Sequence, residues 1–186
     1  MLRRWKKINT KVIHKNPWWT YKLDNFEIQD GFSGEYHYVH TNGSSMVIPI
    51  TDDRKIILVN QFRYLCNRES LEFPCGSVKE GKSHLETAHS ELEEETGYLA
   101  NLMENVGEFN PYNGVTSEIC KIFLARRLQL TVAKPDDTEE FELVFCSPEE
   151  IDVMISEKII WDGMTLAAWM LSRQHVLEIM PTKPSI

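Results

Sequence analysis

Apolar and polar residues alternate along the first third of the chain in the way that β-strands require. The aromatic-rich stretch 18–40 carries the turn signals DG and SG between two runs, which predicts a β-hairpin. Two short runs rich in β-branched residues follow at 46–50 and 55–62, with a polar turn between them. We expect these two runs to form paired strands.

The pattern changes to a helical period after Ser83. Glu86 follows three residues later, which is the arrangement of a capping box. Three apolar residues then recur at the spacing of one helix face: Leu85, Ala88 and Leu92. Gly97 stands where a glycine commonly ends a helix. The spacing therefore predicts a helix over 84–96.

Three strand-like segments and two helices complete the chain. The strands are expected near 101–109, 118–126 and 140–146, and the helices over 148–155 and 165–175. The first of these helices has Ser147 at its N-cap and Pro148 at its first position. Because there is no internal repeat and no low-complexity linker, we expect one α+β domain with an N-terminal β-hairpin extension.

The composition is ordinary for a soluble globular protein. The chain has 186 residues, of which 42% are hydrophobic and 26% charged, enough for one packed core. Its net charge of -8 disfavours non-specific binding to nucleic acid or to an anionic membrane. The four cysteines show no CxxC pair and no zinc spacing, and no stretch is apolar enough to span a bilayer. We expect a cytoplasmic protein.

A stripe of carboxylates lies on the predicted helix. At about 100° per residue, Glu95 and Glu94 lie about 40° and 60° to either side of Glu91, whereas Glu93 points away. Like charges at this spacing repel mildly unless a cation neutralises them. Hard divalent cations such as Mg²⁺ prefer oxygen ligands and leave positions for phosphate oxygens. The alternative is a solvated helix face, which is common for an acidic run.

The segment 76–98 resembles the Nudix box, a glycine followed at fixed spacing by one glutamate and then by a helix of further glutamates. The matching residues are Gly76, Glu91, Leu92, Glu94, Glu95 and Gly97, with Tyr98 in the last apolar place. Two positions depart, because Lys82 stands where the box has Glu and Ser90 where it has Arg. In the family these two side chains brace the loop against the helix, so the departures leave open whether rate or substrate has changed.

The flanking segments resemble the ADP-ribose pyrophosphatase-like branch of the Nudix superfamily. The runs QFRY at 61–64 and ESLEFPCG at 69–76 are similar to the QxRY and LExPAG segments of that branch, and the C-terminal run EKIIWDGMT is similar to its helix start. The resemblance implies mixed β-sheets sandwiched between helices. It further implies a hydrolase domain over 46–180 and an aromatic extension over 1–45 that forms a homodimer.

The same resemblance implies roles for individual residues. The expected metal ligands are Glu91, Glu95 and the backbone carbonyl of Cys75, with Glu94 as a third carboxylate ligand or as the residue that orients water. The expected cation is Mg²⁺, with Mn²⁺ as the alternative. The general base is expected from the acidic loop before a late strand, where Glu140 is favoured over Glu139, and a solvated acidic turn is the alternative for either residue.

Four further residues are candidates for substrate binding. The planar fork of Arg63 suits a phosphate, the alternative being a surface ion pair with a nearby glutamate. Glu118 matches a position that lies near the terminal sugar or phosphate in relatives, although a capping residue would look the same. Trp18 and Trp19 are candidates for stacking on a purine base, with dimer or core packing as the alternative.

Taken with the resemblance, these residues lead us to expect hydrolysis of ADP-ribose or a related nucleoside diphosphate sugar to a nucleoside monophosphate and a sugar phosphate. The alternative is a catalytically weak Nudix-fold protein that binds such a nucleotide without cleaving it, which the residues at 82 and 90 motivate. The preferred base and sugar stay open, because specificity depends on pocket contacts.

Overall fold

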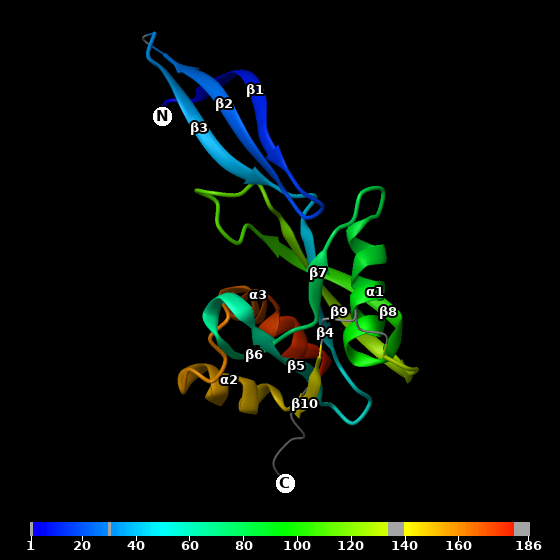
Figure 1. Ribbon diagram of the computed structural model, residues 1–186. Coiled ribbons are helices and arrows are strands. Elements are labelled where there is room, and N and C mark those ends of the chain that lie inside the picture. Colours follow the sequence, from blue (N-terminus) through cyan, green and yellow to red (C-terminus); the bar gives the residue numbers. More distant parts are fainter. Residues whose placement is uncertain (1, 30, 134–139, 181–186) are drawn as a thin grey trace.

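A computed structural model of the chain describes residues 2–29, 31–133 and 140–180 (Figure 1). The strands in this part are β1 (Trp5–Lys15), β2 (Thr20–Ile28), β3 (Ser33–His40), β4 (Ser44–Pro49), β5 (Ile56–Arg63), β6 (Arg68–Glu72), β7 (Cys75–Ser77), β8 (Tyr98–Phe109), β9 (Cys120–Leu130) and β10 (Glu142–Cys146). The helices are α1 (His84–Thr96), α2 (Pro148–Ser156) and α3 (Gly163–Ile179), with a short 3₁₀ turn at Tyr64–Cys66. The predicted α+β class is confirmed.

The two runs expected to pair with each other belong to different sheets, so that expectation was wrong. The order β7-β4-β9-β8 forms one mixed sheet, in which β4 runs parallel to β9, and β10-β5-β6 forms an antiparallel sheet. A single bridge between Ile50 and Ile56 is all that joins the ends of β4 and β5. Residues 46–50 and 56–59 are continuously apolar and buried, and such a pattern indicates burial on both faces without indicating the partner strand.

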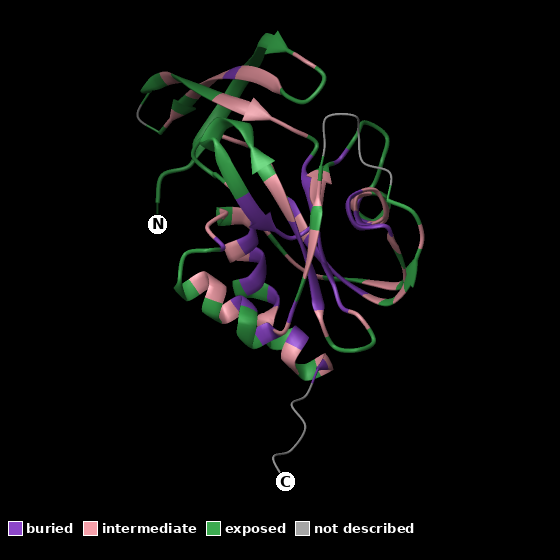
Figure 2. Ribbon diagram, turned by 60° about the horizontal axis from the view of Figure 1, so that its bottom comes forward, coloured by how far each residue is buried: buried purple, intermediate pink, exposed green. Residues whose placement is uncertain are grey.

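Strand β4 of the four-stranded sheet is buried on both faces, which explains the apolar run 46–50. Met46 and Ile48 face the main core, which α2 and α3 complete. Val47 points to the other face and packs against Ala88 and Leu92 of α1. Figure 2 shows that buried residues concentrate in these central strands and on the inner sides of the helices. Burying both faces fixes the position of α1 over the sheet.

Helix α1 begins and ends as the sequence predicts. The Ser83 hydroxyl accepts a hydrogen bond from the Glu86 backbone N–H, Glu86 reaches back to the Ser83 backbone, and Gly97 ends the helix with φ at 71°. The buried Ser45 hydroxyl of β4 donates to the carbonyl of His84 at 2.8 Å. This bond ties the first turn of α1 to the centre of the sheet.

The N-terminal extension is a three-stranded antiparallel sheet rather than a hairpin alone. The predicted hairpin is present as β2 and β3, and β1 pairs along the outer edge of β2. β1 was not predicted because its four lysines interrupt the alternation, and all eleven of its residues are exposed. The sheet projects from the body in Figure 1, and it joins the body where Val39 pairs with Val115 and Ser117.

The two C-terminal helices pack together on one side of the body. Asp152 of α2 accepts hydrogen bonds from Trp169 (2.8 Å) and from Arg173 (2.6 Å at the closest) of α3. α3 starts at Asp162, whose carboxylate accepts a bond from the Thr165 backbone N–H. Within the described residues, no helix is long and apolar enough to cross a bilayer.

Candidate active site

Gly76 and Glu91 touch where strand β7 meets helix α1. A Cβ atom at position 76 would lie 2.1 Å from Oε1 of Glu91 and 2.2 Å from its carboxyl carbon. No L side chain fits there, so glycine is required for the carboxylate to lie against the strand backbone. The first glycine of the box therefore acts together with a glutamate fifteen residues later.

Glu95 reaches the same strand from one helical turn further along α1. Its side chain is only 6% exposed, and its Oε2 accepts a hydrogen bond from the Cys75 backbone N–H at 3.3 Å. The pKa of the Cys75 thiol lies well above its usual value because it bonds to the Cys120 thiol and is buried, and because Glu95 and Glu91 add negative charge. Both carboxylates therefore lie next to Cys75.

This corner offers oxygen donors of the kind that a hard divalent cation prefers. Two carboxylates, those of Glu91 and Glu95, lie beside the backbone of Cys75 and Gly76. Among the described residues, no three His, Cys, Asp or Glu side chains converge as a metal-binding group. A cation here would take oxygens from these two carboxylates, and backbone, water or neighbouring side-chain oxygens would complete its shell.

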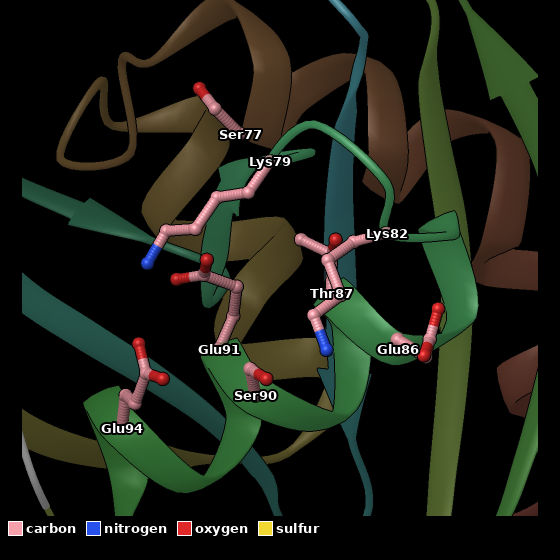
Figure 3. A pocket seen from close by; sticks show the side chains of 8 residues that line it. All are labelled: Ser77, Lys79, Lys82, Glu86, Thr87, Ser90, Glu91 and Glu94. Atoms are coloured by element: carbon pink, nitrogen blue, oxygen red, sulfur yellow. The ribbon is translucent and has the colours of Figure 1, made fainter. Parts of the chain in front are cut away.

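Glu94 lies beside this corner rather than inside it. It lines a pocket between α1 and the loop after β7, together with Glu91 and six other residues: Ser77, Lys79, Lys82, Glu86, Thr87 and Ser90 (Figure 3). Glu91 belongs to both the pocket and the corner. The structure thus brings the three predicted glutamates of α1 to neighbouring positions, with Glu95 the most deeply buried.

Comparison with known proteins shows the family to which the chain belongs. Residues 41–166 match the NUDIX domain. The chain is 32% identical over 165 residues to the methanol dehydrogenase activator of Bacillus methanolicus, an alignment that covers 88% of this chain and 89% of that protein. It is 31% identical over 170 residues to the ADP-ribose pyrophosphatase of Bacillus subtilis strain 168, covering 88% and 92% of the two chains. The chain belongs to the Nudix hydrolase family.

The Nudix fold is confirmed independently by a solved structure. The chain superposes on a crystal structure of an ADP compounds hydrolase with a TM-score of 0.83, over 97% of this chain and 98% of that one, at 22% sequence identity. The similarity includes the N-terminal sheet, because so little of either chain is left out. The predicted resemblance to the ADP-ribose pyrophosphatase-like branch is likewise confirmed.

The two off-pattern residues of the Nudix box face each other across the pocket. Lys82 projects from the loop and Ser90 from α1, and both side chains are exposed. Within the described part of the chain, neither residue takes part in an ion pair or hydrogen bond through its side chain. The loop is instead tied down by its own turn, in which the Lys82 N–H bonds to the Lys79 carbonyl at 3.0 Å.

Arg63 forms a two-pronged ion pair with Glu72. Its Nε donates to Oε1 of Glu72 at 2.7 Å and its terminal amino group donates to the other carboxylate oxygen. These bonds hold the pKa of Arg63 above its ordinary value. Glu72 is 2% exposed, so the pair is anchored on the protein side, while almost half of the Arg63 side chain faces solvent. The sequence did not identify Glu72 as this partner, although Glu72 lies in the segment ESLEFPCG that resembles the family pattern.

Glu118 is held near the loop after β7 through Ser44. The Ser44 hydroxyl donates to Glu118 at 2.7 Å, and Ser44 pairs with Ser77 in the β4–β7 register. The Glu118 carbonyl accepts from Asn110 at 2.6 Å, which fixes the loop between β8 and β9. Glu118 therefore lies across β4 from Ser77, the last residue of β7.

The remaining predicted residues belong to segments other than α1 and β7 or lie outside the described residues. Trp18 and Trp19 occupy the turn between β1 and β2, where Asn16 accepts hydrogen bonds from both backbone N–H groups, and they are 74% and 40% exposed. Glu140 is an exposed residue two positions before β10. Glu139 lies outside the described residues.

Proposed function

We propose that this Nudix hydrolase cleaves the pyrophosphate of ADP-ribose or a related nucleoside diphosphate sugar with the help of a divalent cation. The products would be a nucleoside monophosphate and a sugar phosphate, because water adds across one P–O–P linkage. The observation that supports this best is the convergence of Glu91 and Glu95 on the backbone of Cys75 and Gly76.

The α1 corner would hold the cation, for which we propose Mg²⁺ with Mn²⁺ as the alternative. Glu91 and Glu95 supply carboxylate oxygens, the carbonyl of Cys75 supplies a backbone oxygen, and Glu94 is placed to ligate or to orient water. When bound, such a cation neutralises phosphate charge and lowers the pKa of the attacking water. The buried position of Glu95 keeps its carboxylate in place without the entropy cost of ordering a mobile side chain.

Two residues outside α1 are proposed to contact the substrate. Arg63 is already oriented by Glu72, and its guanidinium has five N–H donors, of which the pair with Glu72 uses two. The remaining donors on its exposed side suit a phosphate oxygen. Glu118 is proposed to bind the terminal sugar, whose hydroxyl groups can donate to a carboxylate.

The general base is proposed to be Glu140, with Glu139 as the alternative. Either would accept a proton from the water that attacks phosphorus, which requires the carboxylate to come within hydrogen-bond reach of that water. A substitution of each by glutamine distinguishes them, since the true base loses the larger share of kcat.

The N-terminal sheet is proposed to form a homodimer. β1 is an edge strand with exposed apolar residues, among them Ile8, Val12 and Ile13, and such edges normally pair or are covered. On the same sheet Trp5 stacks on Phe26 at 4.2 Å between ring centroids. In this proposal Trp18 and Trp19 contribute to the dimer or to base stacking, and the protein is cytoplasmic.

The decisive experiment measures products with Mg²⁺ against ADP-ribose, GDP-mannose and dinucleoside polyphosphates. We expect metal-dependent release of a nucleoside monophosphate from at least one, with kcat/KM at least 100-fold lower for Glu91→Gln/Glu95→Gln. Circular dichroism and thermal melting of that variant check that it is folded. Equal rates for the wild type and the variant on every compound would refute the proposal.

Lys82 and Ser90 favour one second candidate, a Nudix-fold protein that binds a nucleotide without cleaving it. Their departure from the box removes the brace between loop and helix, which would loosen the geometry that catalysis needs. Calorimetry would detect this candidate as micromolar ADP-ribose binding that survives removal of metal and yields no product.

A further inference from the structure

A pocket between α1 and the loop after β7 extends away from the metal corner toward the start of the helix. Its volume is about 140 Å³. About 10–15 Å³ in the same measure is enough for one water molecule. The pocket therefore has room for a tetrahedral anion together with its hydration water.

The short side chain of Ser90 lines the middle of this pocket. Glu86, Ser90 and Glu94 are spaced four apart and so form one row along α1. Ser90 is the shortest side chain of this row and leaves a depression in the middle of it. An arginine at 90, as the family pattern has, would occupy that depression.

Two lysines from the loop supply the positive charge at the pocket. Figure 3 shows Lys79 extending on the side of Glu91 and Glu94, and Lys82 on the side of Thr87. In the described part of the chain neither ammonium group has a carboxylate within 4 Å. Both therefore keep their full donor capacity for a ligand.

Of the other polar groups at the pocket, some already form hydrogen bonds within the protein and others do not. Glu86 accepts two hydrogen bonds at 2.8 Å from Ser83, and the Thr87 hydroxyl donates to the Ser83 carbonyl at 3.0 Å. These groups serve the start of the helix. The hydroxyls of Ser77 and Ser90 are bound to no other described residue and can donate to an anion.

We propose that Lys79, Lys82, Ser77 and Ser90 bind a phosphate group additional to the two of the cleaved pyrophosphate. The pocket shares Glu91 and Glu94 with the proposed cation site, so an anion in the pocket would lie beside that cation. The inference therefore rests on the proposed function. The additional phosphate comes either from a longer phosphate chain or from a monoester on the terminal sugar. In both cases the preferred substrate carries at least three phosphate groups.

Binding of inorganic polyphosphates tests the pocket without relying on turnover. Calorimetry with Mg²⁺ compares inorganic tripolyphosphate with pyrophosphate for the wild type, for Lys79→Gln/Lys82→Gln, and for Lys121→Gln/Lys158→Gln. The last variant loses the same two charges elsewhere on the surface. We expect the lysine-pocket variant to lose about tenfold in affinity for tripolyphosphate relative to pyrophosphate, and the control to keep the wild-type ratio.

Hydrolysis then separates the two sources of the additional phosphate. The kcat/KM ratio of ATP to ADP-ribose reports a longer chain, and that of ADP-ribose phosphorylated on its terminal ribose reports a monoester. One of these two ratios should fall about tenfold in Lys79→Gln/Lys82→Gln and stay unchanged in the control. Equal losses for tripolyphosphate and pyrophosphate, or equal losses in both double variants, would overturn the proposal. If no compound is hydrolysed, the proposed function fails while the calorimetric comparison still decides the pocket.

Discussion

Helices α1 and α2 start in the same way and use their later carboxylates differently. Each has a capping box, made by Ser83 with Glu86 in α1 and by Ser147 with Glu150 in α2. Further along α2, Asp152 meets Arg173 and Trp169 of α3. Further along α1, Glu91 and Glu95 meet the backbone of β7.

The two helices differ in the charges that surround these later carboxylates. The hydrogen bonds from Arg173 hold the pKa of Asp152 below its ordinary value, as expected of an ion pair that joins two helices. The α1 glutamates instead lie near other carboxylates, which costs about 0.2–0.5 kcal/mol for each pair of like charges on a helix. The cation proposed above would offset this repulsion, whereas the pair of Asp152 with Arg173 joins two helices without a ligand.

The largest expected effect comes from Gly76→Ala. The new Cβ would collide with the Glu91 carboxylate, which is the far end of a flexible side chain, so the fold adapts and the carboxylate moves. A displacement of about 1 Å in a catalytic group can cost about 100-fold in rate. We expect a loss of that order in kcat/KM for ADP-ribose with a melting temperature close to that of the wild type. Full activity would show that Glu91 need not lie against β7.

Asp152→Asn should have the opposite profile. Because the pair with Arg173 is more than one-third exposed, we expect a loss of about 1 kcal/mol in the free energy of unfolding, without a change in the metal dependence of turnover. Urea denaturation at several pH values checks the cause. The lowered pKa of Asp152 means that its contribution is present above about pH 4 and is lost as the pH falls through the folded-state pKa, so wild type and variant should converge in acid.

The capping serines offer a matched pair of smaller effects. Ser83→Ala and Ser147→Ala each remove the oxygen that accepts the third backbone N–H of a helix, which costs about 1 kcal/mol. Denaturation should show similar losses for both. Only Ser83→Ala should also weaken Mg²⁺ binding, since α1 alone carries the proposed ligands, and equal effects on metal affinity would contradict the contrast between the helices.

The smallest effect is expected from Glu94→Gln without metal. Removing one like charge next to Glu91 should raise the free energy of unfolding by a few tenths of a kcal/mol. Glu149→Gln on α2 is the control, and thermal melting in a chelating buffer measures both. A destabilised Glu94→Gln would mean that Glu94 has a structural partner.

The sequence predicted the structure best where short-range signals in the chain determine it. The capping box at Ser83, the glycine at 97 and the spacing of the glutamates are local, so α1 and its carboxylates were located correctly. The pairing of β4 with β9 could not be predicted from the pattern, because an apolar run such as 46–49 is compatible with many partner strands and β9 follows much later in the chain. Strand β1 was missed since exposed strands lack the alternation that burial imposes.

Contacts between distant segments also limit how much of the candidate site could be predicted from the sequence. Nothing local indicates that Glu72 orients Arg63 or that Glu91 lies against Gly76. The first contact depends on the pairing of β5 with β6, and the second on how α1 packs against β7. The pocket beside Ser90 likewise depends on the path of the loop after β7. The sequence was enough to predict candidate site residues, but not the contacts that hold them.

Binding of Mn²⁺, followed by the loss of its free-ion electron paramagnetic resonance signal, tests most directly whether the corner of α1 and β7 is the metal site. We predict that the wild type and Asp152→Asn bind Mn²⁺ with the same affinity, that Mg²⁺ displaces it, and that Glu91→Gln/Glu95→Gln binds at least tenfold more weakly. Unchanged Mn²⁺ affinity in the folded Glu91→Gln/Glu95→Gln variant would contradict the assignment.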